Sequence, residues 1–265
     1  MEDLSSLLRE MHTWMHDYIK TFYSDDEEVQ LGITLKEKHT GYVTANAKEL
    51  AVALRLSPHD VLVAEIVGLF HDVGRFAQYS KYKTFNDAHS EDHATLGVKF
   101  LHELPVMKKL GAADFELLCF AINNHNKRAI EPTDDARKLL FAKIIRDADK
   151  LDIYRVLEPY LLNNAAAPNF INCDGDEVSP DFVDDFVNGR QADFYRIRTH
   201  GDRKLVRLMW VYDINFAWTL KRVVEKGYVE RIERALLPRT DKMEAGIKRL
   251  NEYIAKKCAQ EDVAQ

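Results

Sequence analysis

The sequence predicts an all-α protein with a helical C-terminal extension, and three observations lead to this prediction. Apolar residues recur at helical spacing along almost the whole chain. The strict alternation of apolar and polar residues that marks a half-buried strand is almost absent. No low-complexity segment or linker interrupts the 265 residues. We therefore expect a helical core over residues 1–162 and an extension over residues 163–265 that packs on the same domain.

The composition is that of a soluble globular protein and excludes several classes. The formal charge of -6 and the pI near 5.9 provide no basic field for nucleic acid. The apolar stretch VLVAEIVGLF is too short to cross a bilayer, and the N-terminus lacks a signal-peptide pattern. Three widely spaced cysteines indicate neither a disulfide framework nor a zinc ribbon. We expect a cytoplasmic protein without a nucleic-acid or membrane partner.

The first half of the chain contains three clear helix patterns. Residues 3–23 carry an apolar stripe at three- and four-residue intervals, and a second stripe covers residues 40–56. The segment SPHD at 57–60 is a start signal, with Ser57 as N-cap and Pro58 in the first turn. This third helix runs to GLFHD, after which Gly74 is expected to supply a turn.

Further helices follow at shorter intervals. Ser90 is the expected N-cap of the next helix, which Pro105 ends, and another helix spans about 113–125. Thr133 is the expected cap of a long helix. Residues 163–181 are rich in turn-forming residues and predict a long surface loop. The aromatic segment LMWVYDINFAW after it suits a core or a dimer interface, and its helical spacing favours the core.

Six polar residues interrupt these apolar faces near predicted helix ends or inside the long helix. They are His39, His71, Asp72, His93, His125 and Asp149. Each one alone is most simply a helix cap, a partner of the helix dipole or a solvated side chain. Their number and order suggest more, because 32 residues separate His39 from His71 and also His93 from His125. Two stacked helical hairpins would present both histidine pairs to one pocket. A distance of more than about 10 Å between the two pairs would contradict a shared metal site.

The order His, His-Asp, Asp resembles the HD-domain superfamily of metal-dependent phosphohydrolases. The segments that carry the resemblance are KHT at 38–40, GLFHDVGRF at 68–76, HATLGVKFL at 93–101, NNH at 123–125 and RDADKLD at 146–152. The histidines of HATLGVKFL and NNH resemble those of the two-metal subgroups. The resemblance covers about residues 36–160 and implies an HD-type helical bundle.

The resemblance also implies a ligand set. His39, His71, Asp72 and Asp149 would bind a first metal ion, and His93 and His125 would bind a second, with Asp72 bridging the two. In RDADKLD the family pattern places the ligand at Asp149, so Asp147 and Asp152 become candidates to support the ligands or cap the helix. Imidazole and carboxylate suit Mn, Fe, Mg or Zn, and one or two divalent ions are expected per chain.

The chemistry expected of such a site is attack by a metal-activated water on phosphorus. The chain has no GxSxG or Walker motif, which agrees with a reaction that needs no side-chain nucleophile. Arg75 and Lys150 are expected to balance the charge of a phosphate, and His89 is a candidate proton donor to the leaving group. Lys127 and Arg128 are more simply solvated charges.

The expected activity is hydrolysis of a phosphate ester of a small molecule, with a nucleotide as the expected substrate. The segment NNHNKRAIEPTDD lacks the His-His-Glu and Gly-Tyr-Pro signatures of one cyclic-dinucleotide phosphodiesterase subfamily. Two alternatives stay open: a mixed-valent di-iron oxygenase that cleaves a C–C or C–P bond, and a non-catalytic nucleotide-sensing module. The sequence does not choose between monoester and diester, and a homodimer stays open.

Overall fold

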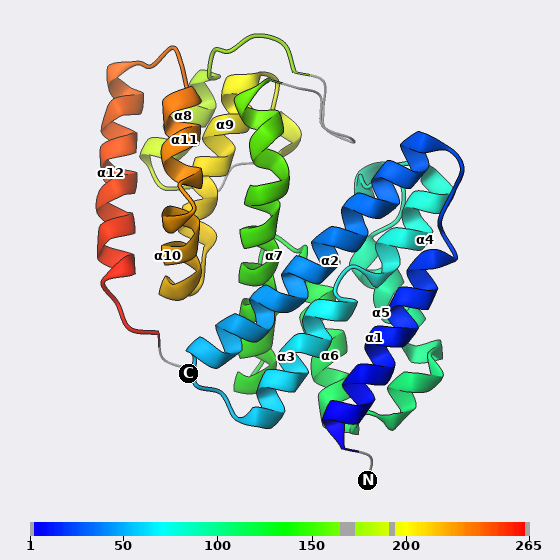
Figure 1. Cartoon of the computed structure of the whole chain (residues 1–265). Coiled ribbons are helices and arrows are strands. Elements are labelled where there is room, and N and C mark those ends of the chain that lie inside the picture. The colour runs from blue at the N-terminus through cyan, green and yellow to red at the C-terminus, as the bar shows by residue number, and fades with distance from the viewer. Residues whose placement is uncertain (1–2, 165–172, 191–193, 263–265) are drawn as a thin grey trace. The chain divides into compact units, whose positions relative to one another are not determined.

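The computed structural model describes residues 3–164, 173–190 and 194–262. Every regular element in these ranges is a helix and none is a strand, which confirms the predicted all-α class (Figure 1). No helix in the described part of the chain is long and apolar enough to cross a membrane. The chain divides into two compact units, and the boundary between them lies between Asp152 and Ile153.

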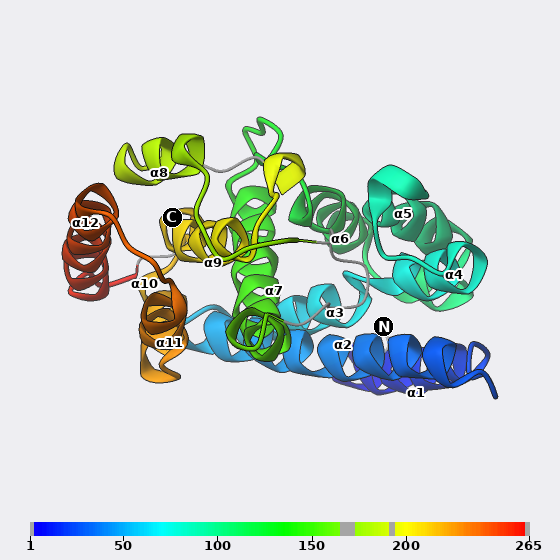
Figure 2. The same ribbon diagram turned by 90° about the horizontal axis from the view of Figure 1, so that it is seen from above.

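The first unit is formed by the helices of the N-terminal part of the chain. Its elements are α1 (Leu4–Lys20), α2 (Glu27–Ala53), α3 (Pro58–Phe70), α4 (Val73–Tyr82), the short 3-10 helix η1 (Asp87–His89), α5 (His93–Glu103), η2 (Pro105–Lys109), α6 (Ala112–His125) and the first part of α7 (Ala136–Leu162). Helix α2 packs along α3, and α5 packs against both α4 and α6 (Figure 2). Leu69 and Phe70, at the end of α3, lie in the core of this unit.

Of the three predicted N-caps, one is confirmed and two are wrong. The Ser57 hydroxyl accepts a hydrogen bond from the Asp60 backbone N–H and caps α3, as predicted. Helix α5 is capped by Asp92 instead of Ser90, and Asp135 instead of Thr133 accepts from the first N–H groups of α7. At both helix starts an aspartate is the cap in place of the predicted hydroxyl residue, because its negative charge also interacts favourably with the helix dipole.

Helix α2 begins 13 residues before the predicted start at residue 40. Asp26 caps it by accepting hydrogen bonds from the N–H groups of Glu28 and Val29. Gly32 makes this part of the helix hard to predict from the sequence, because glycine is a weak helix former. The structure explains the glycine, because a Cβ there would lie 2.4 Å from the ring of Tyr79. His39 consequently lies in the middle of a long helix and not at a helix start.

Gly74 also has a role different from the expected turn. It lies inside α4, and a Cβ at this position would meet the backbone oxygen of His93 at 2.4 Å and the nitrogen of Gly97 at 2.8 Å. The absent side chain lets α4 and α5 approach closely. This close packing brings the start of α5, with His93, next to Asp72 at the start of α4.

The second unit comprises the last turns of α7 and the helices after it. These are α8 (Pro180–Val187), η3 (Phe194–Arg196), α9 (His200–Met209), η4 (Trp210–Asp213), α10 (Ala217–Glu225), α11 (Tyr228–Ala235) and α12 (Asp241–Cys258). Phe182, Phe186 and Leu205 form part of its core, and Val211 and Phe216 of the aromatic segment are also buried, as the core prediction requires. Part of the predicted loop, 165–172, lies outside the described residues, and α8 already begins at Pro180.

Candidate metal centre

The six polar residues singled out from the sequence lie together inside the first unit. They are His39 in α2, His71 and Asp72 between α3 and α4, His93 as the first residue of α5, His125 as the last residue of α6, and Asp149 in α7. The imidazole centroids of His39 and His71 are 5.3 Å apart, those of His71 and His125 5.4 Å, and those of His93 and His125 4.9 Å. Both histidine pairs therefore lie in one cluster, within the separation that a shared metal site would require.

The carboxylate of Asp72 lies between the two histidine pairs. Its Oδ2 is 3.6 Å from Nε2 of His39 and 3.5 Å from Nε2 of His71. Its Oδ1 is 3.3 Å from Nε2 of His93 and 3.7 Å from Nε2 of His125. One oxygen thus faces each pair, as a bridging carboxylate requires.

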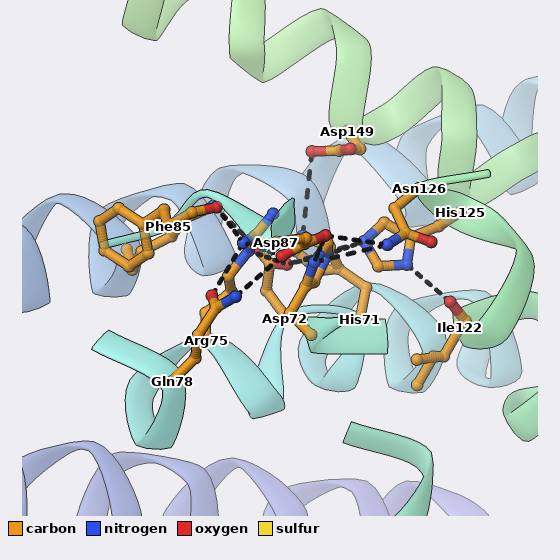
Figure 3. Close-up of polar contacts among 12 residues, drawn as sticks. His71, Asp72, Arg75, Gln78, Phe85, Asp87, Ile122, His125, Asn126 and Asp149 are labelled. Atoms are coloured by element: carbon orange, nitrogen blue, oxygen red, sulfur yellow. Dashed lines mark hydrogen bonds and ion pairs between the residues drawn. The ribbon is translucent and has the colours of Figure 1, made fainter. Parts of the chain in front are cut away.

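Asp149 completes one side of this arrangement. Its Oδ1 is 3.1 Å from Nε2 of His39 and 4.0 Å from Nε2 of His71, and Figure 3 shows it approaching the cluster from α7. We call the set of His39, His71, Asp149 and Oδ2 of Asp72 the first group. The set of His93, His125 and Oδ1 of Asp72 is the second group.

All four histidines turn the same nitrogen toward the cluster, because Nδ1 of each one has a partner on the outside. His71 and His125 donate from Nδ1 to the backbone oxygens three residues earlier, at Gly68 and Ile122, over 2.7 Å in both cases. His39 and His93 are bonded through Nδ1 to carboxylate oxygens of Asp152 and Asp87, again over 2.7 Å. This pattern fixes the tautomer in which Nε2 is a metal ligand.

The donor set fits divalent metal ions. Nε2 of His93 and Nε2 of His125 are 3.0 Å apart, and in neutral imidazoles bonded through Nδ1–H these two atoms direct lone pairs at each other. Such a contact is repulsive unless a cation lies between the nitrogens. Ligands bound at about 2.0–2.1 Å to one ion are about 3 to 3.4 Å from each other, close to the separations found here. Nitrogen and oxygen donors without sulfur suit Mn, Fe, Mg or Zn.

Electrostatics in the second group favours neutral imidazole beside charged carboxylate. Burial, helped by the Arg75 charge, lowers the pKa of His93 to about 3. Burial alone would raise the pKa of Asp72, but the Lys36 ammonium and the neighbouring histidines outweigh it and hold this pKa well below its usual range. Asp72 is therefore ionised and His93 is unprotonated near neutral pH, the states in which both bind metal.

The first group contains one histidine that keeps its proton more readily. Burial lowers the pKa of His71. Burial and Lys36 act in the same direction on His39, but hydrogen bonds with Asp149 and Asp152 outweigh them and raise its pKa. Below this raised pKa, a metal ion bound by Nε2 of His39 would have to displace a proton.

Arg75 occupies a supporting position. Its Nη1 donates to Oε1 of Gln78 at 2.8 Å, to the backbone oxygen of Phe85 at 2.5 Å and to Oδ1 of Asp87 at 2.8 Å (Figure 3). It thereby holds the carboxylate that in turn holds His93. Direct contact of Arg75 with a phosphate stays a prediction.

The other predicted site residues are placed as follows. Lys150 is 8 % exposed and lies about 100° around the α7 axis from Asp149. His89 is exposed and ends η1, so it does not share a helix with His93. Lys127 forms an ion pair with Asp92, and Arg128 is exposed. The proposed roles of Lys150 and His89 remain predictions.

Sequence reasoning missed two charged residues that touch the ligands. Nζ of Lys36 is 2.6 Å from Oδ2 of Asp72, and Asp87 supports His93. Lys36 lies three residues before His39, on the same face of α2. Knowledge that α2 extends back to residue 27 would have revealed it. Asp87 lies in a 3-10 turn, where no periodic pattern indicates its direction.

Comparison with known protein families agrees with this geometry. The family model for the HD domain matches residues 36–154, a segment that contains all six ligand candidates. No curated protein and no solved structure gives a significant match to the chain. HD domains form a superfamily of metal-dependent phosphohydrolases, and the two His/Asp groups in this structure suit divalent metal ions. Residues 36–154 of this chain are thus an HD domain.

Proposed function

We propose that this protein is a metal-dependent phosphohydrolase that hydrolyses a phosphate ester of a small molecule, with a nucleotide as the substrate class. The observation that carries the proposal is the placement of Asp72, which offers one oxygen to each of two buried histidine pairs. A bridging carboxylate of this kind is the core of a two-metal hydrolytic site.

The charge balance of the centre favours an anionic substrate. Divalent ions bound there would lower the pKa of a bound water toward neutrality and stabilise charge on a phosphoryl oxygen. Asp72 and Asp149 supply two negative charges among the six ligands, fewer than the charges of two divalent ions. The ammonium of Lys36 adds a further positive charge next to Asp72. A phosphate group would neutralise this excess.

The cysteines of the chain support water, and not a thiolate, as the nucleophile. Burial raises the pKa of Cys119 to about 11 and also raises the pKa values of Cys173 and Cys258. A thiol with a raised pKa is protonated near neutral pH and is a poor nucleophile.

The side chains also indicate where a substrate would approach. The side chain of Asp149 is 15 % exposed, whereas those of His39, His71 and Asp72 are at most 3 % exposed. Within the first unit, solvent therefore reaches the first group next to Asp149. His39 and His71 are almost fully buried, and their Nδ1 hydrogen bonds fix the orientation of their rings.

The proposal is tested by measuring metal content and hydrolysis together. Protein purified without added metal is analysed for its elements and then assayed against phosphomonoesters, phosphodiesters and nucleotides with Mn²⁺, Mg²⁺, Zn²⁺ or Fe²⁺. Asp72→Ala is expected to lose bound metal and to reduce hydrolysis to the level without enzyme. Asp134→Ala, at an exposed position, is the matched control and should behave as the wild type. Normal metal content and activity in Asp72→Ala would refute the proposal.

Hydrolysis assays without oxygen, together with measurements of oxygen consumption and nucleotide binding, distinguish the two alternative functions. Turnover with Mn²⁺ or Mg²⁺ in the absence of oxygen supports hydrolysis. Oxygen consumption that requires iron, without phosphate release, would identify a di-iron oxygenase with this ligand set. Nucleotide binding without turnover under any metal would identify a sensing module.

A further inference from the structure

We propose that Lys36 is a substrate-binding residue, whose ammonium group is displaced from Asp72 when metal binds and then holds the phosphate of the substrate. This inference rests on the proposed phosphohydrolase function. It assigns a role to a residue outside the histidine and aspartate ligand set.

Lys36 is held directly at the metal centre. It lies one turn before His39 in α2, and its Nζ is 2.6 Å from Oδ2 of Asp72, the oxygen that belongs to the first group. The side chain is only 16 % exposed. The ring of Phe85 lies next to the ammonium, with its centroid 5.4 Å from Nζ, so an aromatic face and a carboxylate oxygen both contact this charge.

Metal binding changes what this ammonium can contact. A divalent ion within the first group would take electron density from Oδ2 of Asp72, the same atom that now accepts the hydrogen bond from Lys36. The ion would also repel the ammonium at short range, where the surrounding protein screens charge less than water does. The ammonium of Lys36 would then lose its carboxylate partner, and its flexible four-carbon stem would allow Nζ to move toward another anion.

Other cations near the centre are less suited to this role. Nη1 of Arg75 already donates to three acceptors, including the carboxylate of Asp87, and this set supports His93. Lys127 pairs with Asp92, which caps α5 and is not a ligand candidate. Nε of Arg75 lies 3.5 Å from Oδ1 of Asp72, whereas the ammonium of Lys36 donates over only 2.6 Å to Oδ2, a ligand oxygen that metal binding would take from it. A phosphate bound at the first group would replace the charge that Asp72 provides in the metal-free protein.

The experiment measures two affinities with opposite expected changes. Isothermal titration first follows Mn²⁺ binding to metal-free protein, and then inorganic phosphate binding to the Mn²⁺-loaded protein. In Lys36→Met, Mn²⁺ should bind about tenfold more tightly, because the ammonium no longer competes for Asp72, and phosphate about tenfold more weakly. Lys36→Arg, which keeps the charge, should retain most of the phosphate affinity. Lys38→Met, at an exposed position of the same helix, should change neither affinity.

Each result decides a different point. Unchanged phosphate affinity in Lys36→Met, with wild-type protein that does bind phosphate, would overturn the role of Lys36 and leave the phosphohydrolase proposal standing. Parallel loss of Mn²⁺ and phosphate affinity would show that Lys36 only supports the fold of the centre. Failure of Mn²⁺-loaded wild-type protein to bind phosphate or hydrolyse any ester would refute both proposals. Lys36→Gln, measured alongside, guards against a defect peculiar to methionine, and circular dichroism checks that each variant is folded.

Discussion

Substitution of Asp87 should weaken metal binding in the second group and leave the first group intact. Asp87 is not a ligand, but its Oδ2 is 2.7 Å from Nδ1 of His93, and its Oδ1 accepts from Arg75 at 2.8 Å. Burial opposes the charge on Asp87, yet His93 and Arg75 outweigh this effect and lower the pKa of Asp87. The carboxylate therefore stays ionised and makes the imidazole a stronger donor.

The size of the effect depends on which property of Asp87 is removed. Asp87→Asn keeps an oxygen that can accept from Nδ1 of His93 but loses the charge, so we expect an affinity loss near the lower limit of about tenfold, or about 1.4 kcal/mol. Asp87→Ala also leaves the buried imidazole without its partner, and the loss should approach about a hundredfold, or about 2.7 kcal/mol. Arg75 keeps its contacts with Gln78 and the Phe85 backbone in both variants.

Equilibrium dialysis against Mn²⁺, with elemental analysis of the bound metal, resolves the two affinities. Asp152→Asn is the matched variant, because Asp152 supports His39 in the first group over the same 2.7 Å. Each substitution should weaken one class of site and spare the other. Equal weakening of both sites by Asp87→Asn, or no weakening even in Asp87→Ala, would refute the reasoning.

Two further predictions concern packing and pH. Gly74→Ala should destabilise the protein by about 3 kcal/mol in urea unfolding, because the new Cβ meets a backbone oxygen of α5. Gly41→Ala is the control; it has open space in α2 and should stabilise by up to about 1 kcal/mol. Since the pKa of His39 is raised above 6.5, Mn²⁺ affinity should fall by up to about tenfold per pH unit below that raised value and level off above it. Calorimetry in buffers of different ionisation enthalpy measures the released proton, and binding without proton release would contradict this assignment.

That the six candidate ligands lie together could be predicted from the sequence, because the order of their residue types is that of the family it resembles. His39, His71, His93 and His125 interrupt apolar segments in two pairs with the same 32-residue spacing, and few other residue types could replace them as ligands. The partners behind them were harder to find. A backbone oxygen holds His71, a carboxylate holds His39, and either choice is compatible with the same local sequence. Asp87 and Lys36 contact the ligands only after α2, α4 and α5 have packed.

Helix boundaries depended on contacts that the sequence does not display. Gly32 looks unfavourable for a helix until the ring of Tyr79 is seen against it. The boundary between the two units lies inside α7, whereas the prediction placed the end of the core at residue 162. A continuous helix has no change in its own periodicity where its packing partners change. Local pattern therefore identified α7 and could not locate the boundary within it.

The four imidazoles divide into two kinds, and this division indicates how the centre can be altered. His71 and His125 are held by carbonyl oxygens of their own helices, which no substitution of a neighbouring side chain can remove. They are fixed anchors, one in each group. His39 and His93 are held by carboxylates that mutation can replace. Redesign of this centre for a different metal preference would therefore start from Asp152 and Asp87, since changes there adjust one donor of each group while the anchor beside it keeps the geometry.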